Sequence, residues 1–214
     1  MARIKPRNAL LLLIVLGIAL VGAIPDLRRT LLRSAGGMLV HQDAEEPADI
    51  IVIAVDAGGA GVLEAADLVR RGRADRVALF AGMPNAVDLE FARRGVQGSS
   101  ATGVSRRQLQ ALGVTAIEEV TRTVAGTDDE SEALPGWCDQ NGFRTIIFVS
   151  TRDHSRRVRR ILGRTMAGHR TRVLVRYSSY SQFDPDTWWL TRGGVRTEVV
   201  EFEKLVFDFL RHPL

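Results

Sequence analysis

The chain has 214 residues, 45% of them hydrophobic, which suits one domain with a short additional segment. Its formal charge of +4 lies outside that domain, because residues 1–43 carry six basic and two acidic side chains and the rest carries 23 of each. A neutral domain argues against nucleic acid as a partner. The single cysteine, Cys138, excludes an intrachain disulfide and a metal site built on several thiolates.

The N-terminus contains an uncharged run, ALLLLIVLGIALVGAI, between three basic residues and Pro25. As a helix its 16 residues would rise about 24 Å, slightly less than a hydrocarbon core of about 30 Å. We favour a signal anchor or transmembrane helix over residues 1–26. A signal peptide cleaved after Ala23 and a hydrophobic core helix are the alternatives.

Residues 27–47 are expected to form an amphipathic helical segment that could lie along a membrane, followed by an acidic linker, HQDAEEP. The basic residues on the two sides of the apolar run are equal in number, so they do not decide its orientation. The short basic leader favours a domain outside the cytoplasm.

Residues 48–214 are expected to form one domain in which strands and helices alternate. The predicted strands are 49–55, 76–81, 116–120, 145–149 and 172–177, and the predicted helices are 62–71, 108–112, 128–141, one after residue 149, and 195–210. We expect a Gly/Ser-rich loop at 95–103 and an interruption or kink near Pro135. This alternation predicts an α/β fold with a doubly wound, mainly parallel sheet, in which ligands bind at the carboxyl ends of the strands.

The first strand ends in the turn DAGGAG, residues 56–61. Backbone N–H groups of Gly58 and Gly59 could hold a phosphate at the start of the next helix, although a structural turn explains the glycines equally well. Asp56 could bind a ribose hydroxyl, a cation or a proton, or it could cap the helix.

Thr127 and Glu130 have the spacing of a capping box, in which each side chain bonds the backbone of its own helix start. The acids from Asp128 to Glu132 favour a helix N-terminus, and they could also face the arginines of the next unit.

The stretch VSTRDHSRRVRRILG places His154 and several arginines at a helix N-terminus, where cations are unfavourable. Val158, Ile161 and Leu162 define its buried stripe, and His154 lies one turn earlier, at the ligand end. Arg157 shares that side of the helix, whereas Arg159 is expected in solvent. A local structural hydrogen bond is the alternative role for His154.

Near the C-terminus, Trp188 and Trp189 could lie in the core, form a lid, or act as an interfacial aromatic anchor near the bilayer. Val200, Lys204 and Phe207 share a helix face, and Glu201 and Lys204 have the spacing of a surface ion pair.

Four segments together resemble a bacterial family of domains of unknown function that includes the YdcF, SanA and ElyC proteins. They are ADIIVIAVDAGG, GTDDE, VSTRDHSRRVRR, and WW followed by EFEKL, and the resemblance covers residues 39–212. It implies a Rossmann-like sheet and, for some members, a link to peptidoglycan biogenesis or lipid-carrier metabolism; one branch is associated with S-adenosylmethionine. Eight positions match the family's motifs: Gly58, Gly59, Thr127, Glu130, His154, Arg157, Glu201 and Lys204. The chain departs from the family after the glycine turn, where an arginine is common and Val62-Leu63-Glu64 stands here.

We therefore expect an envelope protein, anchored once in the bacterial cytoplasmic (inner) membrane with its domain outside, that binds a phosphate-bearing cell-wall or lipid-carrier intermediate. His154 and Glu130 are the expected acid or base, if a reaction occurs. The expected ligand contacts are Asp56, Gly58, Gly59, Thr127, Arg156, Arg157, Glu201 and Lys204. No cofactor is assigned. A nucleotide or S-adenosylmethionine binding module and a non-catalytic envelope scaffold are the alternatives.

Overall fold

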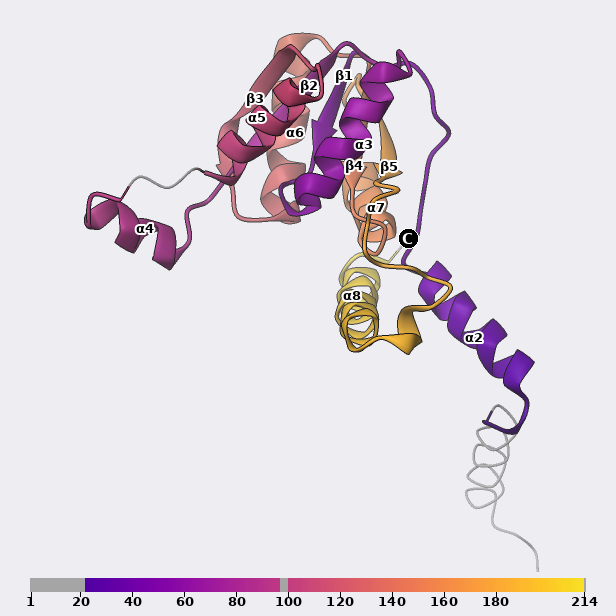
Figure 1. The fold of residues 1–214 in the computed structure, drawn as a ribbon. Coiled ribbons are helices and arrows are strands. Elements are labelled where there is room, and N and C mark those ends of the chain that lie inside the picture. The colour runs from indigo at the N-terminus through magenta and orange to yellow at the C-terminus, as the bar shows by residue number, and fades with distance from the viewer. Residues whose placement is uncertain (1–21, 97–99, 214) are drawn as a thin grey trace, which may run out of the picture.

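The computed structural model describes residues 22–96 and 100–213 (Figure 1). Within them, one five-stranded sheet consists of β1 (Ile50–Ile53), β2 (Arg76–Gly82), β3 (Ala116–Val124), β4 (Thr145–Ser150) and β5 (Arg172–Tyr177). Every pairing is parallel and the strand order is β3-β2-β1-β4-β5, which confirms the predicted α/β fold with a parallel sheet. The chain winds outward from β1 in both directions, so the order reverses between β1 and β4.

Helices cover both faces of the sheet. The helices of the described residues are α2 (Pro25–Gly37), α3 (Gly58–Arg70), α4 (Ala86–Arg93), α5 (Ala101–Ala111), α6 (Thr127–Asn141), α7 (Ser155–Thr165) and α8 (Arg192–Arg211); α2, α4 and α8 lie away from the faces of the sheet (Figure 1). The helices α3 and α5 pack together on one face, and α6 and α7 pack together on the other (Figure 1). This division follows from right-handed crossovers that start in opposite directions from the centre of the sheet.

The core lies around the two central strands, β1 and β4. All four residues of β1 are buried, and so are Ile146 to Val149 of β4. A strand covered on both faces has no solvent side, which explains why these segments are continuous apolar runs.

Helix α3 approaches β1 closely at Gly61. A Cβ atom there would lie 2.6 Å from the Cβ of Ala57 and 2.8 Å from Cγ2 of Ile53. Neither neighbour is a flexible side-chain end, so a larger residue would push the helix away from the strand.

We expect Gly61→Ala to lower the free energy of unfolding by about 1 to 3 kcal/mol, because it overpacks the core. Gly136→Ala is the matched control, since its Cβ would meet nothing within 4 Å in the helix α6. There, alanine is expected to stabilise the helix slightly. Urea unfolding of both variants measures the difference; equal stabilities would contradict the close approach.

Several predicted boundaries differ from the structure. The helix predicted at 62–71 begins at Gly58, and the segment predicted as loop 95–103 includes the start of α5. Helix α4 had no sequence prediction. The predicted interruption at Pro135 is wrong, because α6 continues through this buried proline. The helix loses one backbone hydrogen bond there and retains its apolar contacts.

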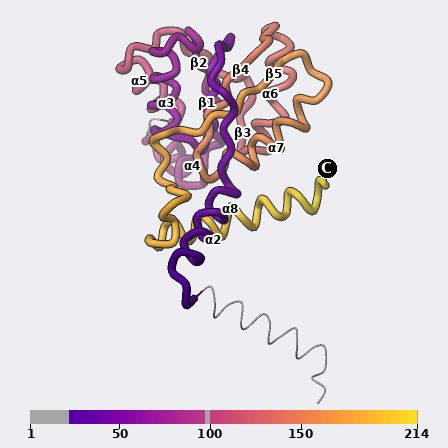
Figure 2. The backbone as a smooth tube through the Cα atoms, turned by 90° about the vertical axis from the view of Figure 1, so that its right-hand side faces the viewer, coloured from indigo at the N-terminus to yellow at the C-terminus, as the bar shows by residue number. Residues whose placement is uncertain are grey.

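The segment before β1 contacts the domain from the second half of α2 onward, and Figure 2 shows it running along one side of the domain. Nε1 of Trp188 donates to the carbonyl of Leu32 in α2 at 2.8 Å, and a Cβ on Gly36 would lie 2.8 Å from the Trp188 ring. In the predicted linker, the backbone N–H of Asp43 donates to the carbonyl of Val175 in β5 at 2.9 Å. The linker therefore lies beside the edge strand β5, and Trp188 holds α2 in place.

None of the helices in the described residues is long and apolar enough to cross a membrane. The predicted anchor, residues 1–26, falls mainly on residues 1–21, which lie outside the described part of the chain.

Candidate functional site

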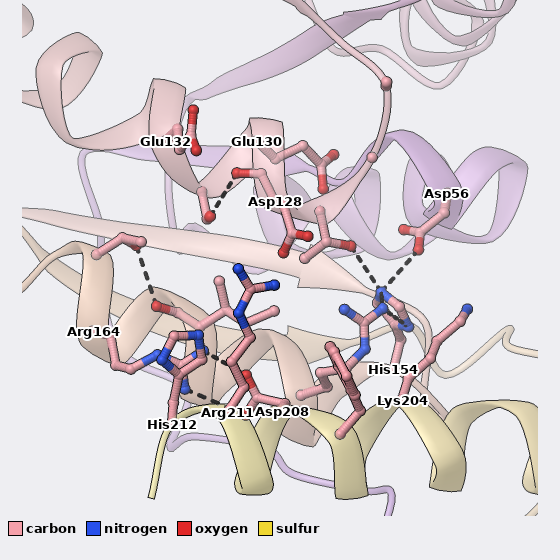
Figure 3. A pocket seen from close by; sticks show the side chains of 18 of the residues that line it. Asp56, Asp128, Glu130, Glu132, His154, Arg164, Lys204, Asp208, Arg211 and His212 are labelled. Carbon is pink, nitrogen blue, oxygen red and sulfur yellow. Dashed lines mark hydrogen bonds and ion pairs between the residues drawn. The ribbon is translucent and has the colours of Figure 1, made fainter. Parts of the chain in front are cut away.

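A pocket of about 1170 Å³ opens where the strand order reverses, beyond the carboxyl ends of β1 and β4. This is the position at which parallel α/β sheets bind ligands. Figure 3 shows acids of α6 along one wall and Lys204 and Asp208 of α8 along the opposite wall, with Asp56 and His154 at one end.

His154 occupies the N-cap position of α7 and is 4% exposed. Its Nδ1 lies 2.7 Å from Oε2 of Glu201, and its Nε2 lies 2.9 Å from the hydroxyl oxygen of Thr127 and 3.2 Å from Oδ2 of Asp56. An ionised carboxylate can only accept, so Nδ1 carries a proton and donates it to Glu201. The other nitrogen, Nε2, faces Asp56 and Thr127 at the pocket, and Nη2 of Arg157 also lies 2.7 Å from it.

Glu201 is the buried anion that holds this group together. Besides His154, it accepts a hydrogen bond from Nζ of Lys204 at 2.6 Å and lies 3.6 Å from Nε of Arg157. Burial alone raises the pKa of Glu201, but the hydrogen bond and charge of His154, with those of Lys204 and Arg157, outweigh burial and lower the pKa to about 2. Glu201 is therefore ionised throughout the neutral range and keeps His154 oriented.

Glu130 of α6 is a second buried carboxyl, 1% exposed. Its Oε1 accepts a hydrogen bond of 2.6 Å from the backbone N–H of Val55, directly after β1. Burial raises the pKa of Glu130 to about 7; the charge of Asp56 adds to this, while the Val55 N–H and Arg157 oppose it. Glu130 can therefore gain or lose a proton near neutral pH.

The predicted capping box of Thr127 and Glu130 is wrong. The N-cap of α6 is Gly126, with no side-chain cap, and the two side chains instead reach His154 and Val55 on other elements. The turn after β3 brings this helix start against the ends of β1 and β4, where these partners are available. These two hydrogen bonds connect α6 to the start of α7 and to the end of β1 at the pocket.

The glycine turn does not join this group. Gly58, at φ +49°, lines a smaller pocket beside Phe80 and Thr102, and Gly59 is exposed; neither lines the main pocket. The physical reason is that α3 packs on the opposite face of the sheet from α6 and α7.

Arg156 also lies apart from the pocket lining. Its Nη2 donates to the carbonyl of Val40 at 2.7 Å, and its backbone N–H donates to the carbonyl of Leu39 at 3.1 Å. One residue further along, about 100° around the helix, Arg157 points to the pocket and donates to Nε2 of His154 at 2.7 Å. Arg156 therefore fixes the chain between α2 and β1.

The far end of the pocket was not predicted from the sequence. Its residues there include Arg164, Asp208, Arg211 and His212, with Ile161 and Phe207 between the two ends and Val200 one turn before Lys204 on α8. Asp208 accepts hydrogen bonds from Arg160 and Arg164. Residues 154, 157, 161 and 164 of α7 and residues 200, 204, 207 and 211 of α8 each follow helical spacing, so this signal was present in the sequence.

Within the described residues, no three His, Cys, Asp or Glu side chains are placed to hold a metal ion, so no ligand set for a metal is assigned to the pocket. Comparison with known proteins identified no matching family model, no matching curated protein and no matching solved structure.

Proposed function

We propose that the pocket binds an amphipathic, phosphate-bearing molecule and that His154 exchanges a proton with it. The observation that supports this most directly is the buried His154–Glu201 pair, which turns Nε2 towards a pocket that Arg157 and Lys204 also line. A carboxylate that fixes one imidazole nitrogen leaves the other as an oriented proton donor or acceptor.

The chemistry of the two pocket ends differs. At the His154 end, the start of α7 has no acid in its first turn, but its backbone N–H groups at Ser155 and Arg156 already donate to the carbonyls of Arg152 and Leu39. An anion there would therefore be bound by side chains. Arg157 and Lys204 add positive charge there. Beyond them, Ile161 and Phe207 offer apolar contact to a chain attached to the phosphate.

Proton transfer would use two groups with separate positions. Protonated Nε2 of His154 can donate to a leaving oxygen, and neutral Nε2 can accept a proton from a hydroxyl or a water. Glu130, with its pKa of about 7, can serve as the second acid or base. The positive charges would stabilise negative charge that develops on phosphate oxygens.

An envelope location is part of this proposal and rests on the sequence. The apolar run before Pro25, the short basic leader and the resemblance to the YdcF, SanA and ElyC proteins support it. A lipid-linked cell-wall intermediate would supply both a phosphate and an apolar chain.

Calorimetric titration in detergent with a polyprenyl phosphate and the matching polyprenol tests this proposal. We expect the phosphate to bind and the alcohol to bind at least tenfold more weakly, since the charged contacts are lost. Arg157→Ala should weaken phosphate binding by about tenfold or more, or roughly 1.4 kcal/mol. His154→Gln should also weaken binding, with circular dichroism as the check on folding.

Arg159→Ala is the matched control, because Arg159 is on the same helix and pairs with Asp43 at 3.2 Å, outside the pocket. Equal binding of phosphate and alcohol, or binding unchanged by Arg157→Ala, would overturn the proposal. Preferential binding of nucleotides or S-adenosylmethionine would favour the alternative ligand class.

A further inference from the structure

Helix α8 has an apolar face that the fold leaves in solvent. Six side chains form it, and each keeps between 38% and 78% of its surface exposed. They are Val195, Val199, Phe202, Val206, Phe209 and Leu210. Figures 1 and 2 show α8 at the periphery of the molecule, leading to the C-terminus. A continuous stripe of this kind on an exposed helix usually marks a contact surface.

The other faces of α8 already have partners. Glu198, Glu201, Leu205 and Asp208 are buried against the domain. Val200, Lys204 and Phe207 line the pocket. Of the six stripe residues, Phe209 also stacks under the guanidinium of Arg160, 3.4 Å from its ring centroid. The other five serve neither the core nor the pocket, and their apolar character is unexplained within one copy of the described chain.

The spacing of the stripe is that of helix pairing. From Val195 to Phe209 the apolar residues follow each other at steps of four, three, four and three. This repeat averages 3.5 residues, the period at which two helices keep one seam facing each other. The stripe is one helix face wide and, up to Leu210, about 22 Å long at 1.5 Å per residue, so a second helix would cover it.

The charges beside the stripe favour a second copy of the helix over a lipid surface as the partner that covers it. Arg196 and Glu203 border the same side of the seam, and both are exposed; Glu203 lies at the rim of the pocket, which it also lines. Neither forms an ion pair within the part of the chain that the structure describes. An anionic lipid surface would attract Arg196 and repel Glu203. An antiparallel copy of the same helix presents the opposite charge to each of them.

We propose that two copies of this chain associate through antiparallel pairing of their α8 helices. In the register that we infer, Val199 packs against Phe202 of the second copy, and Val195 against Val206 of the second copy. Arg196 then lies opposite Glu203 of the second copy, and the twofold axis repeats this ion pair. Flanking pairs of this type set partner and orientation in paired helices.

Charge reversal tests the pairing in the full chain in detergent, with sedimentation equilibrium over a hundredfold range of concentration. Each single variant, Arg196→Glu or Glu203→Arg, places like charges opposite each other at both symmetry-related positions of the dimer. We expect each to raise the dissociation constant of the dimer by about tenfold or more. The double variant Arg196→Glu/Glu203→Arg restores opposite charges. Its dimer dissociation constant should return to within about threefold of that of the original chain. Arg107→Glu, an exposed charge reversal on α5, is the control and should change nothing.

A second readout tests the register. In an equal mixture of Val199→Cys and Phe202→Cys chains, mild oxidation should form the mixed disulfide faster than either self-pair. The native Cys138 is buried and is not expected to interfere. A chain that stays monomeric, single variants that behave as the original, or a double variant that fails to recover would each overturn the proposal. If Arg196→Glu weakens binding to phosphatidylglycerol vesicles while Glu203→Arg strengthens it and the chain is monomeric, the stripe binds membrane instead.

Discussion

Replacing Glu201 by glutamine is expected to lower the free energy of unfolding at neutral pH by about 3 kcal/mol, the cost of breaking a buried ion pair. The substitution leaves Arg157 and His154 in a buried site without their shared carboxylate. Chemical unfolding at pH 7 measures this loss. Lys204→Met is the comparison, because Lys204 is half exposed and its removal should cost no more than about 1 kcal/mol.

The loss caused by Glu201→Gln should depend on pH in a defined direction. The pKa of Glu201 is lowered from 4.5 to about 2 in the folded protein, so its ionised form contributes stability above pH 4.5. That contribution disappears as the pH falls from 4.5 to 2, and the two proteins should converge there. A difference in stability that stays constant between pH 7 and pH 2 would show that Glu201 is not the anion at the centre of the site.

The effect of Glu130→Gln on the free energy of unfolding is expected to depend on pH in the opposite direction. The pKa of Glu130 is raised from 4.5 to about 7, so the protonated carboxyl stabilises the fold below pH 4.5 and this contribution is lost as the pH rises through 7. Glutamine stays neutral and can still accept the hydrogen bond from Val55. Relative to the original chain, the variant should therefore gain about 3 kcal/mol between pH 4.5 and pH 8, from a pKa difference of about 2.5 units at 1.36 kcal/mol each.

Thermal unfolding at a series of pH values tests this, with Glu132→Gln as the matched control on the same helix. Glu132 is largely exposed and its partner Arg122 is half exposed. The change in stability caused by Glu132→Gln should therefore be nearly the same at each pH. If the Glu130→Gln and Glu132→Gln curves run parallel, Glu130 does not titrate near neutral pH, and it loses its place as the second acid or base of the pocket.

The arginines at the start of α7 have separate partners, which the sequence did not reveal. Arg159 pairs with Asp43 and Arg160 with Asp208, while Arg156 binds backbone carbonyls before β1. The acids Asp128 to Glu132, which the sequence analysis considered as partners, are not among these contacts. Most of the positive charge on α7 therefore holds the linker and α8 in place, and Arg157 alone of this group reaches the pocket end with His154.

Local pattern located all five strands of the described sheet, although the strand predicted at 116–120 ends four residues before β3 does and the one predicted at 49–55 runs two residues past β1. The strand predicted at 172–177 matches β5, and the one at 145–149 falls one residue short of β4. Buried parallel strands are continuous apolar runs, so a short window of sequence contains the whole signal. The predicted loop at 95–103 is too long at its end, since residues 101–103 belong to α5, which Ser100 caps by accepting from the N–H of Gly103. Glycine and serine suggest turns, and serine is also a preferred N-cap residue.

Within the site, the sequence by itself determined which residues of α7 share a side, because helical spacing is a property of one element. It thereby identified His154 and Arg157. Only the tertiary structure decided that Glu201 orients His154, that Thr127 and Glu130 leave their own helix, and that Gly58 faces away from the main pocket. These partners lie 27 to 75 residues apart in sequence, and the packing of α6, α7 and α8 beside the end of β1 sets which of them meet.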